Sequence, residues 1–308
     1  MSQNNNTMSM DKMTDEQLSA ALGRYQKRES LGMLLGIAFV IAACIMAFVV
    51  HFLPLFAALF FIGVGVIILV ALPAQKKKKA LMQQQLGGFF KGELDRHFGP
   101  APATPELPIN RAYLEKSTLI YYPWDSCTVE NFREGEWQGL HFSAANVELS
   151  HLVEEKSGPD NENWMTRTET VFRGVIIRCK NVCDTGLDFM AVDRMQEQGE
   201  LTDPAVFRRR FSVRTAQGGD PEVTPELCAL CREYEKASAG HVRGLTVQNG
   251  EVDLALETGY LFAAIPGGFD VRDVSGMRKW FTATLTGMGT LLELLKNSPA
   301  LSTSAEKV

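Results

Sequence analysis

The strongest constraint on this chain is a charge-free stretch over residues 31–75, which contains no Asp, Glu, Lys or Arg. It divides into two apolar segments of about 20 residues, at 31–50 and 55–72, separated around Pro54. A helix rises about 1.5 Å per residue, so each segment is long enough to cross a hydrocarbon layer of about 30 Å. Backbone groups inside lipid must pair within their own segment, and proline interrupts a helix. The stretch therefore predicts a transmembrane helical hairpin over residues 31–73.

Basic residues lie on both sides of the predicted hairpin: Arg24, Lys27 and Arg28 before it, and Lys76, Lys77, Lys78 and Lys79 after it. The turn between the two segments carries no Lys or Arg. Because basic flanks stay in the cytoplasm, we expect both chain ends inside the cell and the turn outside. We expect membrane lipid to contact the two segments, and anionic head groups to lie near the four lysines.

Two alternatives compete with the hairpin. The segments could be buried core helices of a soluble protein, although two adjacent charge-free segments of this length are uncommon there. Ile41-Ala42-Ala43-Cys44 also has the pattern of a lipoprotein processing site, which would place a lipid on Cys44. The long polar segment before this site and the apolar sequence after Cys44 favour the hairpin.

The hairpin divides the rest of the 308 residues into three parts. We expect a cytoplasmic N-terminal segment at 1–30, a basic amphipathic connector helix at 74–100, and a soluble cytoplasmic domain at 101–308. The connector fits a stalk on the membrane surface or the first helix of the soluble domain, and Gly87-Gly88 interrupt its helical pattern. The net charge of −5 leaves about −9 on the sequence after the lysine run. Nucleic acid repels such an acidic domain, so no nucleic-acid partner is expected.

The pattern of the soluble domain predicts an α+β fold, mainly an antiparallel sheet with flanking helices. Apolar or alternating segments predict strands at 119–122, 168–178, 206–213 and 260–265, and one strand or a hairpin at 137–152. Asn249-Gly250 lies within an alternating segment at 245–256 and predicts a hairpin with a type I′ turn. Helical spacing predicts helices at 225–237 and 274–295. Thr14, followed by acidic residues, predicts the capped start of a helix that runs toward the first span.

The six cysteines raise the question of metal binding. Cys179 and Cys183, together with Cys228 and Cys231, could form a four-thiolate zinc site, and the spacing of the second pair suits one. The second pair also falls on the apolar face of the predicted helix at 225–237, where a thiol acts as a small buried hydrophobe. A cytoplasmic location predicts reduced thiols. The sequence leaves zinc binding by these four cysteines open.

We assign no catalytic, cofactor-binding or metal-binding residue from the sequence, and no cofactor. The histidines lack metal-ligand spacing, although His141 and His151 could meet across a strand pair. The segment 207–211, Phe-Arg-Arg-Arg-Phe, could form a basic patch for phosphate, but fits better as a strand with phenylalanines facing the core and arginines facing water. Gly32 and Gly36 have the spacing that lets helices approach closely, within the hairpin or between two copies.

The soluble domain resembles a bacterial membrane-anchored family. The resemblance rests on the segment at 203–214, on Leu-Cys-Ala-Leu after Thr224-Pro225, and on the hairpin that contains Leu254-Ala-Leu. The family is the domain of unknown function numbered three-one-three-seven, which is found behind a membrane hairpin. The resemblance covers about residues 110–295 and implies a multi-pass protein of the bacterial inner membrane. It brings no catalytic residues.

Two classes of function fit this sequence. The favoured one is a membrane-anchored cytoplasmic interaction or scaffold domain that holds an unidentified protein partner. The alternative is a membrane-tethered enzyme or ligand sensor, whose site is assembled from residues that are distant in the sequence. A deep polar cleft with convergent titratable groups would favour the alternative, and an exposed apolar surface would favour the scaffold.

Overall fold

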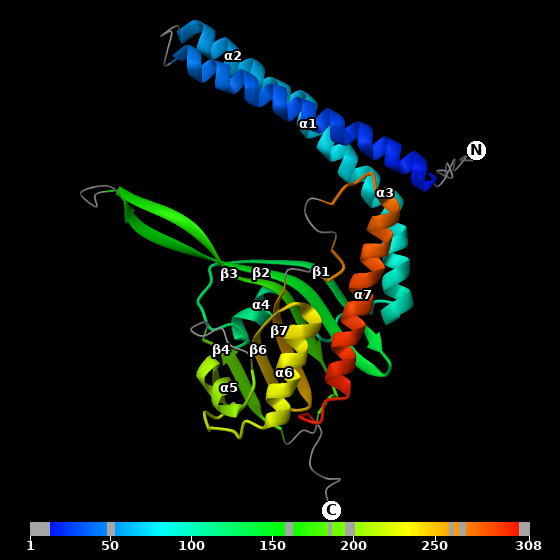
Figure 1. The fold of residues 1–308 in the computed structure, drawn as a ribbon, viewed down its shortest axis with the longest axis vertical. Helices are drawn as coiled ribbons and strands as arrows, with labels where there is room; N and C mark the ends of the chain where they lie inside the picture. The colour runs from blue at the N-terminus through cyan, green and yellow to red at the C-terminus, as the bar shows by residue number, and fades with distance from the viewer. Residues whose placement is uncertain are drawn as a thin grey trace, which may run out of the picture. The chain divides into compact units, whose positions relative to one another are not determined.

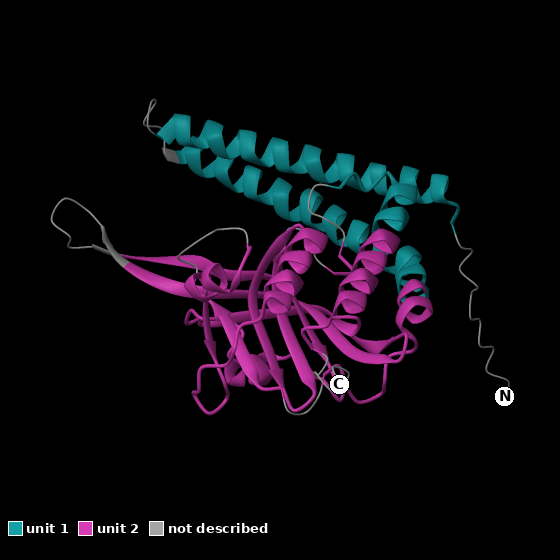
Figure 2. Cartoon of the chain, turned by 60° about the horizontal axis from the view of Figure 1, so that its bottom comes forward, with its two compact units in different colours: residues 1–92, 267–280 teal, residues 93–266, 281–308 magenta. Residues whose placement is uncertain are grey.

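The computed structural model describes residues 13–47, 53–157, 163–183, 187–194, 201–258, 262–264 and 269–301. The chain divides into two compact units (Figure 2). Unit 1 consists of residues 1–92 and 267–280, and unit 2 of residues 93–266 and 281–308. A segment from the C-terminal half of the chain therefore belongs with the N-terminal helices.

Unit 1 is built from long helices (Figure 1). α1 (Asp15–Ile45) begins after Thr14, whose hydroxyl accepts a hydrogen bond from the Gln17 N–H at 3.3 Å, while the Gln17 side chain accepts from the Thr14 N–H at 3.1 Å. α2 (Leu53–Val66), a π-helical turn η2 (Ile67–Ala71) and α3 (Leu72–Phe98) follow. Gly87 and Gly88 interrupt the apolar spacing of the expected connector helix but not the helix itself, because both lie inside α3. Glycine weakens a helix by only about 1 kcal/mol per residue, which the surrounding helix formers offset.

Three glycines allow α1 to pack closely against α2 and η2. A Cβ atom on Gly36 would overlap the side chain of Ile67. A Cβ atom on Gly63 would lie 2.8 Å from the Gly36 carbonyl oxygen, and one on Gly32 would lie 3.1 Å from the Ala71 nitrogen. Gly32 and Gly36 therefore pack the hairpin on itself, which is one of the two alternatives that their spacing left open.

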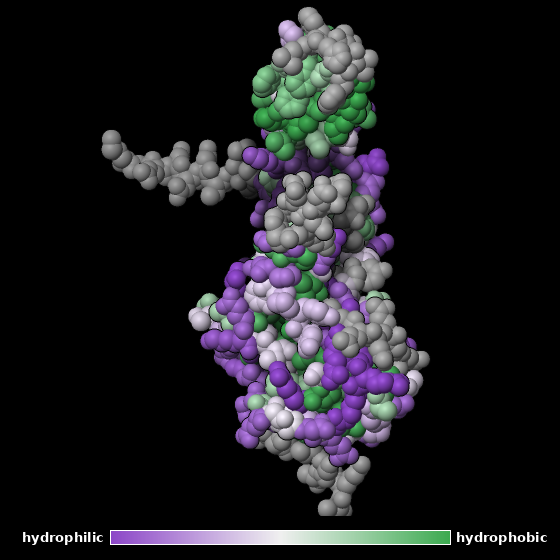
Figure 3. Space-filling view, turned by 90° about the vertical axis from the view of Figure 1, so that its left-hand side faces the viewer, coloured by the Kyte–Doolittle hydropathy of each residue, from purple (hydrophilic) through white to green (hydrophobic). Residues whose placement is uncertain are grey.

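Two helical segments, Asp15–Ile45 and Pro54–Phe98, are long and apolar enough to cross a membrane. Their apolar side chains form an outer surface (green in Figure 3), on which Leu34, Phe61 and Leu69 are 66%, 72% and 75% exposed. Soluble proteins rarely expose so large an apolar surface to water. The two helices thus indicate association with a membrane.

Unit 2 contains a seven-stranded sheet in the order β1-β2-β3-β7-β6-β4-β5, and all of its pairs are antiparallel. The strands are β1 (Ser126–Trp137), β2 (Leu140–Ser157), β3 (Asn163–Cys179), β4 (Phe189–Asp193), β5 (Phe211–Arg214), β6 (Gly240–Gln248) and β7 (Glu251–Thr258). The predicted α+β class is confirmed. So is the turn between β6 and β7, where Asn249 and Gly250 have φ angles of 53° and 79°.

Helices cover parts of both faces of the sheet. On one face, Leu114 of α4 (Arg111–Lys116) packs in a cluster with Val147 and Phe172. Side chains alternate along a strand, so Phe142 points to the opposite face, where its ring lies 5.0 Å from that of Phe98. α6 (Pro225–Ser238) and α7 (Val274–Lys296) lie side by side over the sheet (Figure 1) and confirm the two predicted helices. Their buried apolar residues in unit 2 are Leu227, Cys228, Leu230, Cys231, Tyr234, Phe281, Leu285, Met288, Leu291, Leu292 and Leu295.

The strand predicted at 206–213 is wrong in its first half, which forms α5 (Pro204–Arg210), and only β5 is extended. Asp203 caps α5 by accepting hydrogen bonds from the Ala205 and Val206 N–H groups at 2.9 and 3.0 Å, and Pro204 occupies the first helical position. Residues 119–122 form no strand, although Leu119 is buried in the core. Of the segment predicted at 260–265, residues 262 and 263 form a turn, and the residues at 260, 261 and 265 lie outside the described part.

Candidate functional site

The four cysteines considered for zinc are all in unit 2. Cys179 ends β3 and Cys183 follows it, whereas Cys228 and Cys231 lie on α6. Burial raises the pKa of the Cys179 and Cys231 thiols well above the ordinary value, which favours the protonated thiol over the thiolate that zinc binds. Among the described residues, no group of three or more His, Cys, Asp or Glu could hold a metal ion.

His141 and His151 do not meet across a strand pair, because both lie on β2. Ten residues separate them, which corresponds to about 33 Å along a strand. His141 Nε2 lies 2.8 Å from Glu134 Oε1, and His151 Nδ1 lies 2.6 Å from Asp125 Oδ2. Each imidazole has its own carboxylate neighbour, so the two histidines belong to separate local contacts.

The arginines at 208–210 diverge and do not make one basic patch. Arg208 forms an ion pair with Asp220 and donates to the Pro221 carbonyl at 2.6 Å. The expectation that these arginines face water is wrong for Arg210, which is buried, whereas Arg209 is exposed. The phenylalanines do face the core: Phe207 and Phe211 are buried, and their rings stack with centroids 4.5 Å apart.

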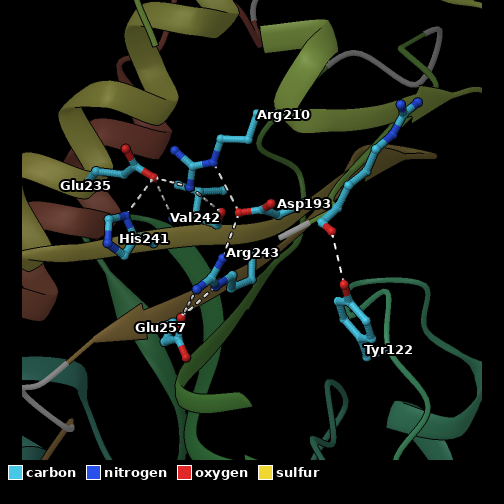
Figure 4. Close-up of polar contacts among 9 residues, drawn as sticks. Tyr122, Asp193, Arg210, Glu235, His241, Val242, Arg243 and Glu257 are labelled. Carbon is cyan, nitrogen blue, oxygen red and sulfur yellow. Dashed lines mark hydrogen bonds and ion pairs between the residues drawn. The ribbon is translucent and has the colours of Figure 1, made fainter. Parts of the chain in front are cut away.

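Arg210 belongs to a cluster of charged residues between α6 and the strands of the sheet. We call it the charge cluster (Figure 4). Its members are Asp193, Arg210, Glu235, Arg243 and Glu257. Asp193 ends β4, and its carboxylate is almost fully buried. Its Oδ2 atom accepts hydrogen bonds from Arg210 Nε at 3.1 Å and from Arg243 Nη1 at 2.9 Å. A single buried carboxylate oxygen thus holds two guanidinium groups.

Glu235 of α6 and Glu257 of β7 complete the charge cluster. Glu235 Oε1 accepts from Arg210 Nη2 at 2.6 Å and from the Val242 N–H at 3.0 Å, and Arg210 Nη2 also donates to the Val242 carbonyl at 3.1 Å. Arg243 Nε donates to Glu257 Oε2 at 2.6 Å. The cluster therefore links α6 to β4, β6 and β7 through charge-assisted hydrogen bonds.

The electrostatics of the charge cluster suit a structural role, which is to hold α6 against the sheet. Burial lowers the pKa of Arg210, but the hydrogen bonds and charges of Glu235 and Asp193 outweigh it and leave the pKa above its ordinary value. At the exposed rim of the charge cluster, His241 Nδ1 lies 3.7 Å from Glu235 Oε1.

A groove of about 490 Å³ lies between α6 and α7 in unit 2. Its lining residues are Glu226, Ala229, Leu230, Glu233, Thr290, Glu293, Leu294, Asn297, Ser298 and Pro299. The apolar part of the lining comes from both helices, with Leu230 on α6 and Leu294 on α7. The charged part is wholly acidic, because three glutamates and no Lys or Arg line the groove. Within the described part of the chain, none of Glu226, Glu233 and Glu293 has an ion-pair partner.

The four lysines expected near lipid head groups differ in their contacts. Lys78 forms an ion pair with Glu29 of α1, whereas Lys76, Lys77 and Lys79 are exposed. All four lie on α3 within unit 1.

No protein-family model, curated protein or solved structure matches this chain. The resemblance to the domain of unknown function therefore stays a prediction.

The sequence did not reveal the charge cluster, because its members are spread from residue 193 to residue 257 and meet only through the strand order. One local signal was available: Asp203-Pro204 is a helix start, which would have placed Arg210 at the end of a short helix. The groove gave no signal, since glutamates on the polar face of α6 resemble an ordinary solvated surface.

Proposed function

We propose that this protein is a membrane-anchored scaffold, whose hairpin crosses the bacterial inner membrane twice and whose α+β domain recruits a protein partner in the cytoplasm. The exposed apolar side chains of α1, α2 and η2 support the anchor. The cations at Arg24, Lys27 and Lys76–Lys79 support a cytoplasmic location for both chain ends. The proposal includes membership of the family with the domain of unknown function numbered three-one-three-seven.

The observation that carries the scaffold function is the groove between α6 and α7. Its apolar lining at Leu230 and Leu294 suits the apolar side chains of a bound helix. Its three unpaired carboxylates attract cations. The occupant is therefore a basic amphipathic helix of a partner protein, with its apolar face toward the two leucines and its Lys or Arg residues toward the glutamates.

The spacing of the carboxylates supports an extended occupant. Glu226 and Glu233 are seven residues apart on α6, which is about two helical turns or 10.5 Å. Glu293 lies on α7 and faces the same groove. Cations along one side of a bound helix can therefore meet carboxylates from both walls.

The test uses the full chain in phosphatidylcholine nanodiscs and a fluorescent synthetic helix of leucine and lysine as the probe. Anisotropy should show binding that weakens as salt rises. The triple variant E226Q/E233Q/E293Q should bind about tenfold more weakly, because three exposed ion pairs of about 0.5 kcal/mol each are lost. An acidic probe with the same apolar face should not bind.

The matched control is E136Q/E154Q/E222Q, which removes the same charge from exposed positions outside the groove. It should leave the affinity within about twofold of the wild-type value, since exposed charges at a distance are screened. Equal loss in both triple variants, or no binding of the basic probe to the wild-type protein, would refute the groove as the partner site.

The topology is tested separately. A reporter that is active only in the periplasm should be inactive when fused after Val308. Activity of that fusion would overturn the proposed orientation and revive lipidation of Cys44.

A further inference from the structure

We propose that a cleft of about 460 Å³ in unit 1 binds the phosphate of an anionic membrane phospholipid. The cleft is lined by residues of α1 and by one residue that precedes α7: Ala20, Gly23, Arg24, Gln26, Lys27, Ser30 and Arg272. This inference rests on the proposed membrane anchor, and it adds a defined lipid site to that anchor.

The cleft brings together two neighbouring cations of α1 and a third, Arg272, that is distant from them in the sequence. Among the residues that the structure describes, Arg24 and Lys27 have no ion-pair partner. Arg272 donates from Nε and Nη2 to the two carboxylate oxygens of Asp270 at 2.9 and 2.8 Å, which leaves Nη1 for a ligand. With Asp270 counted, the local charge is about +2, which suits a phosphate group held by guanidinium and ammonium donors.

Gly23 explains how Arg272 reaches the surface of α1. A Cβ atom at Gly23 would lie 3.2 Å from Cδ and 3.3 Å from Cγ of Arg272. The missing side chain therefore leaves room for the aliphatic part of Arg272 beside α1, and Arg272 lines the cleft together with Arg24 and Lys27.

The cleft lies where lipid phosphates are expected. Ser30 directly precedes Leu31, at which the charge-free stretch begins. At 1.5 Å per residue, Lys27 is about 6 Å and Arg24 about 10 Å from that boundary. The head-group layer on each side of a bilayer is about 5–8 Å thick, and the long side chains of Lys and Arg extend into it.

Gln26, a lining residue of the cleft, carries an unpaired polar atom that suits the rest of a head group. Within the described part of the chain, Oε1 of Gln26 is buried and has no hydrogen-bond partner. A head group that carries hydroxyl donors, such as the glycerol of phosphatidylglycerol, can supply the missing donor beside the phosphate.

The test measures lipid binding to the delipidated full chain in a neutral detergent by native mass spectrometry. Phosphatidylglycerol should bind with a stoichiometry of one at low lipid concentration. The variant R24Q/K27Q/R272Q should bind at least about tenfold more weakly, because it removes three cations that each contribute about fivefold near the surface. The control K116Q/R214Q/K236Q removes the same charge from exposed positions outside the cleft and should stay within about twofold of wild type.

Two further experiments identify the source of the phosphate and test the lipid site separately from the membrane anchor. Excess inorganic phosphate or glycerol 3-phosphate should not displace the lipid; displacement by either would show that the site takes a soluble phosphate. Flotation with phosphatidylcholine vesicles tests the anchor alone. If all variants float but bind phosphatidylglycerol equally, the cleft proposal is wrong and the anchor stands. If the wild-type protein does not float, the anchor itself is wrong.

Discussion

Arg210 donates from Nε to Asp193 Oδ2 across 3.1 Å, and the two side chains are only 4% and 1% exposed. Such a buried pair adds little net stability, because removing both charges from water costs about as much as their attraction returns. Loss of one partner is different, since it leaves the other charge buried and uncompensated. Arg243 shares the same oxygen of Asp193, so this carboxylate compensates two cations.

We therefore expect Asp193→Asn to lower the free energy of unfolding by about 3–5 kcal/mol. The amide has the size of the carboxylate but no negative charge, so two guanidinium groups lose their shared counter-ion. Urea titration of the full chain in nanodiscs, followed by tryptophan fluorescence, measures the change. The matched control is Asp220→Asn, which removes the 75% exposed partner of Arg208 and should cost at most about 1 kcal/mol. Similar losses in the two variants would show that Asp193 does not act as a buried counter-ion.

Glu134 on β1 gives a prediction about pH. Its side chain is 1% exposed, and its carboxylate accepts from the Glu106 N–H at 3.0 Å, the Leu107 N–H at 3.1 Å and His141 Nε2 at 2.8 Å. Burial raises the pKa of this carboxyl, but the hydrogen bonds and the His141 charge outweigh it and lower the pKa below its ordinary value of 4.5. The folded state therefore binds this proton less readily than the unfolded state.

The contribution of Glu134 is thus fully present above about pH 4.5 and is lost as the pH falls through the lower folded-state pKa. Glu134→Gln should cost about 1–3 kcal/mol at neutral pH, because the amide has one acceptor oxygen where the carboxylate has two, and its NH2 group cannot accept from the remaining N–H donors. Urea titrations at a series of pH values should show the difference from wild type shrinking below about pH 4.5. Glu136→Gln, at an exposed position of the same strand, is the control and should change little at any pH. A difference that stays constant down to pH 3 would contradict the lowered pKa.

Local signals predicted the elements that local physics decides. Thr14 predicted the start of α1, and the apolar periodicity predicted α6 and α7. Asn249-Gly250 predicted the hairpin of β6 and β7. The strand prediction at 206–213 was wrong in its first half because Phe207 and Phe211, four residues apart, suit a helical turn as well as one face of a strand.

The charge cluster and the groove depend on the order of the strands and the placement of the helices, which no local sequence pattern contains. Asp193, Arg243 and Glu257 become neighbours only because β4, β6 and β7 are adjacent in the sheet. In the same way, Glu226 and Glu233 become the wall of a groove only because α7 lies beside α6. Strand order and helix placement come from packing of the whole domain, so both sites required the three-dimensional structure.

Thiol reactivity tests the states of the cysteines. Burial raises the pKa of Cys179 and Cys231, so we expect both thiols to be protonated and to react slowly with a thiol reagent at pH 8. Mass spectrometry of labelled peptides should show at least about tenfold slower modification than in urea, where the two residues lose their protection. Rapid labelling of Cys231 in the folded protein, or one zinc ion released per chain on unfolding, would contradict buried protonated thiols.

Gly36 and Gly65 form a matched pair for testing how the hairpin is held. A Cβ atom on Gly36 would overlap Ile67, whereas one on Gly65 would meet no atom within 4 Å. Replacing either glycine by leucine raises helix propensity by a similar amount, about 1 kcal/mol. The difference between Gly36→Leu and Gly65→Leu therefore isolates the steric effect, which should destabilise the first variant by about 1–3 kcal/mol relative to the second. Circular dichroism during unfolding in mixed micelles measures this difference. Equal stability of the two variants, together with loss of a dimer in Gly36→Leu alone, would instead assign the Gly32/Gly36 surface to contact between two copies of the chain.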